Sequence, residues 1–524
     1  MANPINPNDF VPVIDNPFFT LEPGATFITE SPDGSEVDNF VVTRETKVID
    51  GVVCHVIHDT AVVDGEVVEK TNDYFAQDKA GNVWYFGEDT KEFENGKVVS
   101  TEGTWRAGVD GAQPGIIMEA SPHTGDSYDQ ENAPGVAQDH AVVLDANGGA
   151  IKVPYGTFDH ILVTEETSPL TPDEIEWKHY AAGVGFLLTK DGQSPHDPLE
   201  QLVTIRVDGT VHGDTLFGYA GGDEINGNGG KDNLDGRLGA DTIHGGSGND
   251  LLHGGDDKVA DYLYGDSGRD TIHVGTTDHA FGGSGNDLIQ LFDNTGFGAI
   301  DGGGQDFHNV GRSAGDVLQF DGALDLTAPG ESERITGIET LSMKDGQGND
   351  SLSVSAQDVL HLGTGTFNPS LGGHDAFGPG DAVRIDGEGG DKLSLSGNWS
   401  AIDPHNGPDG FDVFTCHAPT GNGNVYALVQ EDIAVTNTAA TTCAGRRNAA
   451  GHAPNSRARA RRLMTRSRPL TRAAAAAEWV PSLAAPGSSW RGWRRRDSAS
   501  ARSAACGRCP AAAGHADDRG GRRG

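Results

Sequence analysis

The sequence is poor in several features that define large classes of protein. It has 5 Cys, and Cys443, Cys506 and Cys509 all lie near its C-terminal end, so no disulfide framework supports the remainder. No apolar run approaches the roughly 18 residues of a membrane span. The stretch MANPINPNDFVPVIDNPFF has neither a basic segment nor an apolar core, so it is not a Sec signal peptide. These absences alone favour a soluble chain without disulfides.

Motifs of the common hydrolases are also missing. There is no HExxH, which excludes the zinc-protease interpretation. The stretches GDSGR and GGSGN fall inside glycine-rich repeats, so the nucleophile elbow of lipases is absent as well. Because no protease or lipase motif is found, we assign no catalytic residue. Whether the chain is an enzyme stays open, and a protein without catalysis is favoured.

Acidic residues, by contrast, are abundant and unevenly distributed. The formal net charge is -39, but from Cys443 onward 18 Arg face 4 acids and no Lys, which gives 18 - 4 = +14. Residues 1–442 therefore carry 20 basic and 73 acidic groups, or 20 - 73 = -53. Such an acidic body repels nucleic acid and anionic membranes and attracts cations. We expect a cation, and no nucleic acid, among its partners.

Residues 441–524 differ abruptly in composition and are mostly Arg, Ala, Pro, Gly and Ser. We expect a disordered tail that arises from frameshifted or read-through translation. A basic arm for nucleic acid or membrane is the alternative. The pair Cys506 and Cys509 has no second CxxC beside it and is a weak zinc or redox signal.

Glycine is abundant, with 75 residues, and its spacing indicates the architecture of the chain. Blocks of nine residues recur in phase: GTVHGDTLF from Gly209, GYAGGDEIN from Gly218, GNGGKDNLD from Gly227, GRLGADTIH from Gly236, GGSGNDLLH from Gly245, GDSGRDTIH from Gly265 and GGSGNDLIQ from Gly282. The sixth residue of every block is Asp, and the eighth is Leu or Ile. A disordered linker does not explain two positions that stay in phase over seven blocks.

Each repeated position has a physical reason. Gly at the first and fourth places permits positive φ, so a tight turn can expose its carbonyl oxygens. The last three residues predict a short strand whose middle side chain points inward. One apolar residue in nine makes a thin core, which does not offset the entropy of ordering so many glycines. Carbonyl and Asp oxygens on neighbouring turns would form an all-oxygen cage, which suits Ca²⁺ better than Mg²⁺.

The pattern resembles the RTX (repeats-in-toxin) family, with its nonapeptide G-G-x-G-x-D-x-U-x. The resemblance implies a right-handed parallel β-roll with two nonapeptides per turn and several Ca²⁺ ions between turns. The implied calcium-ligand residues are Asp214, Gly218, Gly221, Asp223, Gly227, Gly230, Asp232, Gly236, Gly239, Asp241, Gly245, Gly248, Asp250, Asp261, Gly265, Gly268, Asp270, Gly282, Gly285 and Asp287.

Two irregular blocks interrupt the roll. GGDDKVADYLY is two residues longer than the others, so it places Asp261 only roughly in sixth position and should bulge. In the block around Asp278, His279 stands where Asp is expected, which puts one calcium site in doubt.

Residues 297–440 predict a degenerate continuation of the roll. GQGNDSLSV and GEGGDKLSL keep the repeat skeleton, with Asp350 and Asp391 as either further ligands or turn residues. Apolar runs between them, including GDVLQFDG, ITGIETLSM, AQDVLHLG and DAVRIDG, predict strands and a thicker core. The stretch VYALVQEDIAVTNT, 425–438, resembles the last strands of a type I secretion signal.

Residues 1–207 predict a separate antiparallel β domain. Dipeptides such as Asp50-Gly51 and Asp64-Gly65 alternate with β-branched runs, which is typical of hairpins. DYFAQDKAGNVWYFGEDT and GAQPGIIMEASPHTGDSYDQE resemble an uncharacterised bacterial family. One polar cluster could line a sugar site or be outward residues of a hairpin: Asp73, Tyr74, Gln77, Asp78, Trp84, Tyr85 and Glu88.

The sequence thus predicts an all-β protein with four parts: 1–207, the calcium-binding β-roll 208–296, the degenerate region 297–440 and the tail 441–524. We expect it to be secreted or bound to the cell surface, with calcium folding the roll after export by type I machinery. Two alternatives stay open. One is an exported carbohydrate-active enzyme with its site in 1–207, and the other is a surface or matrix adhesion protein that binds glycans or cells.

Overall fold

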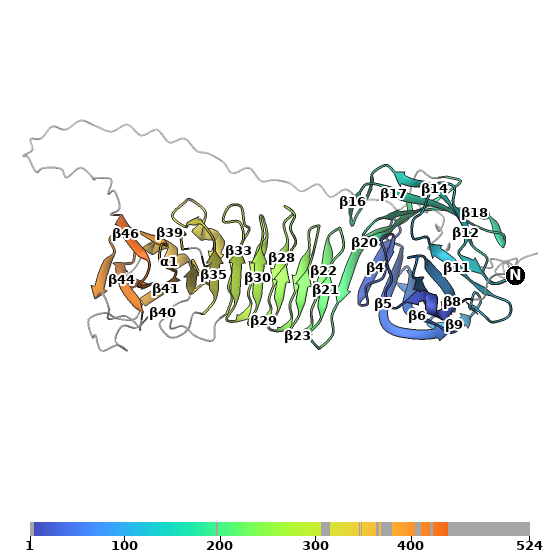
Figure 1. The fold of residues 1–524 in the computed structure, drawn as a ribbon, viewed down its shortest axis with the longest axis horizontal. Coiled ribbons are helices and arrows are strands. Elements are labelled where there is room, and N and C mark those ends of the chain that lie inside the picture. Colours follow the sequence, from blue (N-terminus) through green and yellow to red (C-terminus); the bar gives the residue numbers. More distant parts are fainter. Residues whose placement is uncertain are drawn as a thin grey trace, which may run out of the picture.

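The computed structural model describes residues 5–194, 198–304, 315–344, 346, 348–362, 366–367, 380–403, 410–419 and 423–438. Within these ranges the chain is almost entirely β-strand, as the sequence predicts. A rounded β domain stands at one end of a long stack of short strands (Figure 1). The predicted tail 441–524 and its CxxC lie outside the described residues. No helix in the described part of the chain is long and apolar enough to cross a membrane.

The N-terminal domain is built from long antiparallel strands joined by tight turns. Its main strands are β4 (Ala25–Glu30), β5 (Glu36–Ile49), β6 (Val52–Val63), β7 (Glu66–Asp78), β8 (Val83–Glu94), β9 (Lys97–Ser100), β11 (Gln113–Met118), β12 (Ser127–Asp129), β13 (Glu131–Asn132), β14 (His140–Gly148), β17 (Ile161–Ser168), β18 (Thr171–Ala181), β19 (Gly185–Asp191) and β20 (Pro198–Asp208). Shorter elements are η1 (Pro7–Asp9), β1 (Phe10–Val11), β2 (Asp15–Asn16), β3 (Phe19–Thr20), β10 (Trp105–Arg106), β15 (Ile151–Val153) and β16 (Gly156–Phe158).

The predicted hairpin turns are present. Asp50 and Gly51 both have positive φ, at 47° and 84°, and Asp64 and Gly65 have 52° and 81°. Two successive positive φ angles define the type I′ turn, whose twist matches that of the flanking strands. These turns connect β5 to β6 and β6 to β7.

The strands of this domain close into a ring, which we call the N-terminal barrel. β4 to β8 pair in sequence, β8 pairs with β11, and β11 pairs with β13. β13 follows β12 in the chain after a single residue, so the two strands join this arc to the next. β12 pairs with β14, and β14, β17, β18, β19 and β20 pair in order. β20 then pairs with β4, from Gln201 opposite Glu30 to Val207 opposite Ala25, and completes the ring. A closed ring leaves few free strand edges.

β20 also begins the roll, because its other edge pairs in parallel with β22. One face of the roll contains β22 (Asp223–Asn226), β25 (Thr242–His244), β28 (Tyr262–Tyr264), β31 (His279–Phe281), β34 (Ile300–Asp301) and β37 (Ile335–Thr336). The other contains β21 (Thr215–Phe217), β24 (Asn233–Asp235), β27 (Leu251–His253), β30 (Thr271–Val274), β33 (Leu288–Leu291), β35 (Val317–Phe320), β38 (Thr340–Ser342), β41 (Gly380–Asp386), β45 (Asn424–Gln430), β44 (Phe411–His417) and β43 (Ser400–Asp403). The turns add β23 (Gly229–Gly230), β26 (Ser247–Gly248), β29 (Ser267–Gly268) and β32 (Ser284–Gly285).

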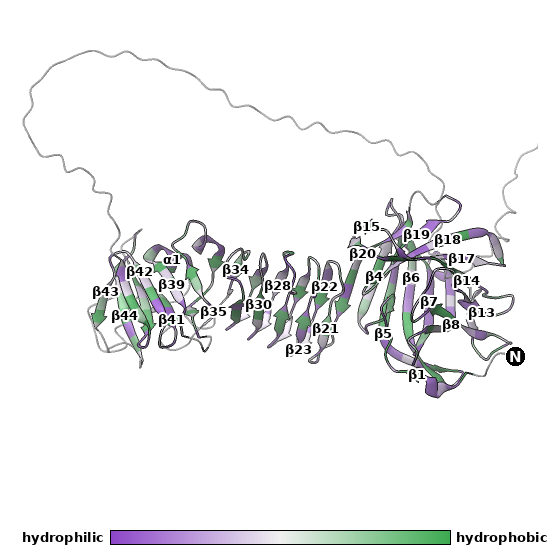
Figure 2. Ribbon diagram, turned by 45° about the horizontal axis from the view of Figure 1, so that its top comes forward, coloured by the Kyte–Doolittle hydropathy of each residue, from purple (hydrophilic) through white to green (hydrophobic). Residues whose placement is uncertain are grey.

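The register confirms two nonapeptides per turn. Leu216 lies opposite Leu234, which lies opposite Leu252, a step of 18 residues each time. The eighth residues of the blocks are almost completely buried in two inward-facing columns, one per face. Figure 2 shows apolar bands on strands of the roll. The long block keeps this register, with Leu263 opposite Ile243, and its extra residues lie in the turn 256–259.

The region after residue 297 has a thicker core, as predicted, but one of its runs is not a strand. It contains β36 (Ala323–Asp325), η2 (Ser332–Arg334), β39 (Ser351–Ser355), β40 (Thr366–Phe367), β42 (Lys392–Ser396) and β46 (Ala434–Thr438). The run AQDVLHLG, expected to be a strand, forms the helix α1 (Ala356–Leu362). The reason is a capping box: Asp358 accepts from the Ser355 N–H at 2.7 Å, and the Ser355 hydroxyl accepts from the Asp358 N–H at 3.3 Å.

Candidate calcium-binding rows of the β-roll

The sixth-position aspartates form two rows along the roll, here called row one and row two. Row one contains Asp214, Asp232, Asp250, Asp270, Asp287 and Asp316, and row two contains Asp223, Asp241, Asp261 and Asp278. In both rows the Oδ1 of one Asp accepts the backbone N–H of the Asp one turn earlier, for example from Asp232 to Asp250 at 2.9 Å. The carboxylates therefore lie at successive turns with one oxygen already engaged.

The second oxygen of five of these carboxylates is buried and has no hydrogen-bond donor. The five residues are Asp232, Asp241, Asp250, Asp270 and Asp287, each with Oδ2 in this state. Each residue is at most 2 % exposed. A buried carboxylate oxygen without a partner is costly, because it loses its water and gains nothing in return. The fold thus presents five oxygens that lack a partner of positive charge.

These oxygens point toward the first glycine of their own block. A Cβ added to Gly227 would lie 2.6 Å from Asp232 Oδ2, and one added to Gly265 would lie 2.7 Å from Asp270 Oδ2. The same Gly227 faces the Gly245 carbonyl oxygen of the next turn, at 2.5 Å from that Cβ position. The prediction of positive φ is confirmed at the fourth place, as in Gly230 at 121°, but is wrong at the first place, where Gly227 and Gly265 have no positive φ. At the first place glycine instead keeps open a space that carboxylate and carbonyl oxygens surround.

Burial raises the pKa of most row carboxyls. Loss of hydration is the largest cause in every case, and neighbouring Asp charges add to it for several members. The resulting pKa is about 9 for Asp241, about 8 for Asp316, about 7 for Asp223, Asp261 and Asp270, and about 6 for Asp250. A bound cation would reverse this effect, since it favours the charged carboxylate.

The N-terminal barrel terminates row two. Asp223 has no earlier aspartate to engage its Oδ1, and the Tyr155 hydroxyl donates to that oxygen instead, at 2.7 Å. The Tyr155 ring also fills the space beside Gly221, where an added Cβ would meet it at 2.5 Å. Asp223 Oδ2 accepts the Tyr219 N–H at 2.5 Å. Both oxygens of this first Asp are thus satisfied by protein groups. At the start of row one, the Thr210 backbone N–H and hydroxyl both donate to one oxygen of Asp214, Oδ2.

Replacing Tyr155 by Phe should therefore loosen the junction between barrel and roll. The change leaves a buried carboxylate oxygen of Asp223 without its donor, which costs about 1–3 kcal/mol. Denaturant unfolding of the full chain in millimolar calcium measures this loss. Tyr262→Phe is the control, because Tyr262 lies on the outer face and is 42 % exposed. An equal, small effect of both variants would contradict the role of Tyr155.

The structure brings the predicted aspartates together and adds others. Asp261, in the long block, occupies row two between Asp241 and Asp278. The prediction that His279 replaces the ligand-position Asp is wrong, because the block is shorter and Asp278 itself occupies the row. Asp316 extends row one. It was not predicted from the sequence, because the preceding stretch GRSAG does not follow the nine-residue pattern. Further along, the Asp350 N–H donates to Asp391 Oδ1 at 3.0 Å in the same manner.

The donors present fit Ca²⁺. All are oxygens, either Asp carboxylates or glycine-turn carbonyls, and hard cations with variable coordination prefer such ligands. Among the described residues no three His, Cys, Asp or Glu side chains gather at one point to hold a metal. Neighbouring aspartates of a row are one turn apart. A calcium site between two turns must therefore take most of its ligands from backbone carbonyl oxygens. Which of the predicted residues are ligands stays a prediction.

The polar cluster considered for residues 73–88 does not form one site. Tyr85 donates to Asp73 at 2.7 Å in the buried interior, with Glu88 also in contact. Tyr74 instead bonds Asp89, and the Trp84 indole donates to Asp78 at 2.9 Å. These side chains engage different partners, which gives no support to a shared sugar site.

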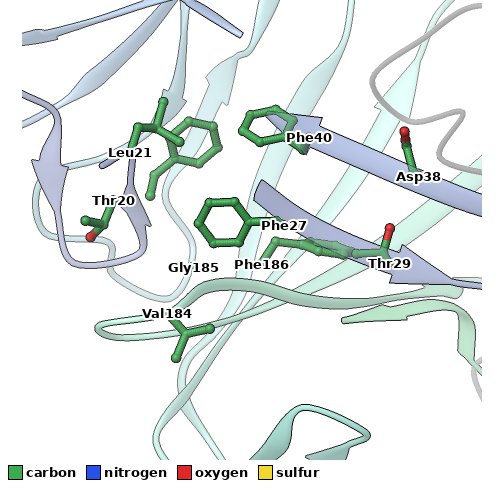
Figure 3. Close-up of a pocket in the computed structure, with 10 residues that line it drawn as sticks. Thr20, Leu21, Phe27, Thr29, Asp38, Phe40, Val184, Gly185 and Phe186 are labelled. Atoms are coloured by element: carbon green, nitrogen blue, oxygen red, sulfur yellow. The ribbon is translucent and has the colours of Figure 1, made fainter. Parts of the chain in front are cut away.

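The barrel contains several cavities. One of about 30 Å³ is lined by Phe19, Leu21, Phe27, Phe40 and Val184 and has room for a water. Figure 3 shows the side chains that line it. A second, of about 350 Å³, lies beside Trp105 and Arg106, and none of the seven cluster residues lines it.

Comparisons with known proteins agree with the geometry of the roll. The RTX calcium-binding nonapeptide repeat matches in four copies, at residues 208–243, 227–258, 236–272 and 274–292. The comparison with curated proteins finds no match. A solved structure of a protein from Parabacteroides distasonis ATCC 8503, described as a lipoprotein, is 13% identical with a TM-score of 0.21 and covers 36% of this chain and 97% of its own. Residues 208–292 are thus RTX calcium-binding nonapeptide repeats, joined through β20 to a β-barrel at their N-terminal side.

Proposed function

We propose that this chain is a secreted protein whose roll folds when calcium fills the two Asp rows, with the N-terminal barrel as its cargo. The observation that carries the proposal is the set of five buried Oδ2 atoms without a donor. Each is an oxygen that folding desolvates and that a cation would satisfy. Because calcium binds the folded rows and not the extended chain, its binding free energy adds directly to folding, as RT ln(1 + [L]/Kd).

Calcium dependence also suggests the route of export. Free calcium in cytoplasm is far below the roughly 10⁻⁴–10⁻³ M at which extracellular modules bind it. The roll would then stay unfolded inside the cell and pass through a type I channel as an extended chain. Outside, calcium would fold it and hinder its return. We assign the export signal to residues 415–438, which include β45 and β46. A glycan or cell-surface ligand for the barrel stays a prediction.

Secretion from a host with a type I transporter tests this function. We expect the chain to reach the medium only when the transporter and residues 415–438 are both present. In millimolar calcium the secreted roll should resist trypsin at the exposed residues Lys231, Arg237, Lys258 and Arg269, whereas EGTA should permit cleavage there. Export without the transporter or without 415–438 would contradict the route. Equal cleavage with and without calcium would contradict calcium-driven folding.

A further inference from the structure

Three polar side chains on the barrel form a hydrogen-bonded chain that the roll does not involve. The His140 Nε2 lies 2.8 Å from the Ser127 Oγ, and the His140 Nδ1 lies 2.9 Å from the Asp129 Oδ1. Ser127 and Asp129 are exposed, and His140 is half-buried. The order serine, imidazole, carboxylate, with the imidazole bonded through both nitrogens, is the arrangement that activates a serine nucleophile.

Strand register places the three groups. Ser127 and Asp129 are two residues apart on β12, so their side chains share one face, while Tyr128 between them is buried on the other. His140, the first residue of β14, lies directly opposite Asp129. β14 is held on its other edge by β17, with His140 opposite Thr167. Ser127, His140 and Asp129, which we call the triad, therefore lie on a hydrogen-bonded sheet and not on a loop.

Hydrogen-bond chemistry fixes the imidazole tautomer. A carboxylate only accepts, so the proton of neutral His140 lies on Nδ1 and is donated to Asp129. Nε2 is then the free acceptor and must receive the Ser127 hydroxyl proton. This is the one neutral tautomer that satisfies both contacts, and it leaves Nε2 ready to remove that proton. An exposed network of this kind adds little to stability, so the fold does not require it.

We propose that Ser127 and His140 hydrolyse activated carboxylic esters, with Asp129 as the positioning residue. Ser127 Oγ attacks the ester carbonyl carbon while its proton passes to His140 Nε2. The C–O bond to the leaving group breaks, and the alcohol or phenol departs with that proton. Water then attacks the acyl carbon while Nε2 accepts one of its protons. The bond from the acyl carbon to Ser127 Oγ breaks, the proton on Nε2 returns to Oγ, and the carboxylic acid departs. No oxidant or metal enters this cycle.

The setting restricts the substrates. The triad lies on an open face, so it suits small, unhindered acyl groups with good leaving groups, such as aryl acetates. General-base assistance contributes roughly 10²–10⁴-fold in enzymes, and solvent around Ser127 and Asp129 places this site at the lower end.

The test uses the full chain with p-nitrophenyl acetate. Ser127→Ala and His140→Ala should each lower the rate at least tenfold, and peptide mass analysis should find the acetyl group on Ser127. His123→Ala is the matched control and should keep the parent rate: its imidazole also lies near a carboxylate, 3.5 Å from Asp126, but within the described ranges no hydrogen bond joins it to a serine. Circular dichroism of these exposed-site variants should be unchanged.

Asp129→Asn tests positioning separately from structure. The kcat should fall with little change in KM, because the His140 imidazole loses the carboxylate that orients it. Asp129→Glu, which keeps a carboxylate, should restore part of the rate. A Ser127→Ala chain that keeps the parent rate would overturn the proposal, as would acetylation only at other residues. A parent chain no faster than buffer, or an Asp129→Asn chain that keeps the parent kcat, would overturn it as well.

Discussion

Replacing Gly268 by Ala should abolish calcium-dependent folding of the central roll. Gly268 has φ of +148° and lies opposite Gly248 in the stacked turns. An added Cβ would fall on the Gly248 carbonyl oxygen, well inside any allowed contact, so the two turns must separate. Separation breaks the Asp250 N–H bond to Asp270 Oδ1, two residues further along, which measures 2.8 Å. Strain and lost bonding together should cost about 3 kcal/mol or more.

Ser267→Ala is the matched control for this variant. Ser267 is the preceding residue, it is exposed, and its hydroxyl makes one surface bond to the Gly246 carbonyl at 3.1 Å. Its loss should change stability by about half a kcal/mol at most. Calcium titrations followed by circular dichroism compare the two. A Gly268→Ala chain that folds at the same calcium concentration as Ser267→Ala would show that the turns are not closely stacked.

In the absence of calcium, acidification should stabilise the roll. Except for Asp214, the row carboxyls have a folded pKa above the ordinary Asp value, up to about 9 for Asp241 and about 8 for Asp316. The folded state then holds protons that the unfolded state has lost, so stability is greatest below about pH 4 and falls as pH rises toward 9. In EGTA the β signal of the roll should therefore be greater at pH 5 than at pH 8.

Calcium should remove this trend. The cation stabilises the charged carboxylates in place of protons, and at low pH protons compete with it. With millimolar calcium the melting temperature should be highest near neutral pH and fall toward pH 5. A β signal in EGTA that is greater at pH 8 than at pH 5 would mean that the row carboxyls are not desolvated as described.

The two Asp rows could be predicted from the sequence because the pattern that produces them is local and periodic. Asp at every sixth place and Leu or Ile at every eighth fix the strand, its inward face and the register of each turn, as Asp241 and Ile243 illustrate. Counting in blocks of nine residues misplaced or missed an Asp where the block length changed. Asp278 precedes the expected position, and Asp316 follows an insertion.

Other features depend on contacts that no local pattern encodes. Tyr155 donates a hydrogen bond to Asp223, which lies 68 residues later in the chain. Closure of the barrel depends on β20 pairing with β4, which are far apart in the chain. Ser127, Asp129 and His140 converge only because β12 and β14 pair in one register. The helix α1 does have a local signal, because Ser355 and Asp358 stand at capping-box spacing. The apolar residues of the same run led to the strand prediction instead.

The central claim is that calcium at the Asp rows folds the roll, and a calcium titration of the full chain by far-ultraviolet circular dichroism tests it most directly. We expect β signal to appear with a midpoint of roughly 10⁻⁴–10⁻³ M calcium, and not with magnesium at the same concentration. Asp241→Ala with Asp250→Ala should raise the midpoint at least tenfold. Asp256→Ala, whose carboxylate is 98% exposed and outside both rows, should not change it. A spectrum that is identical in EGTA and in millimolar calcium would contradict the claim.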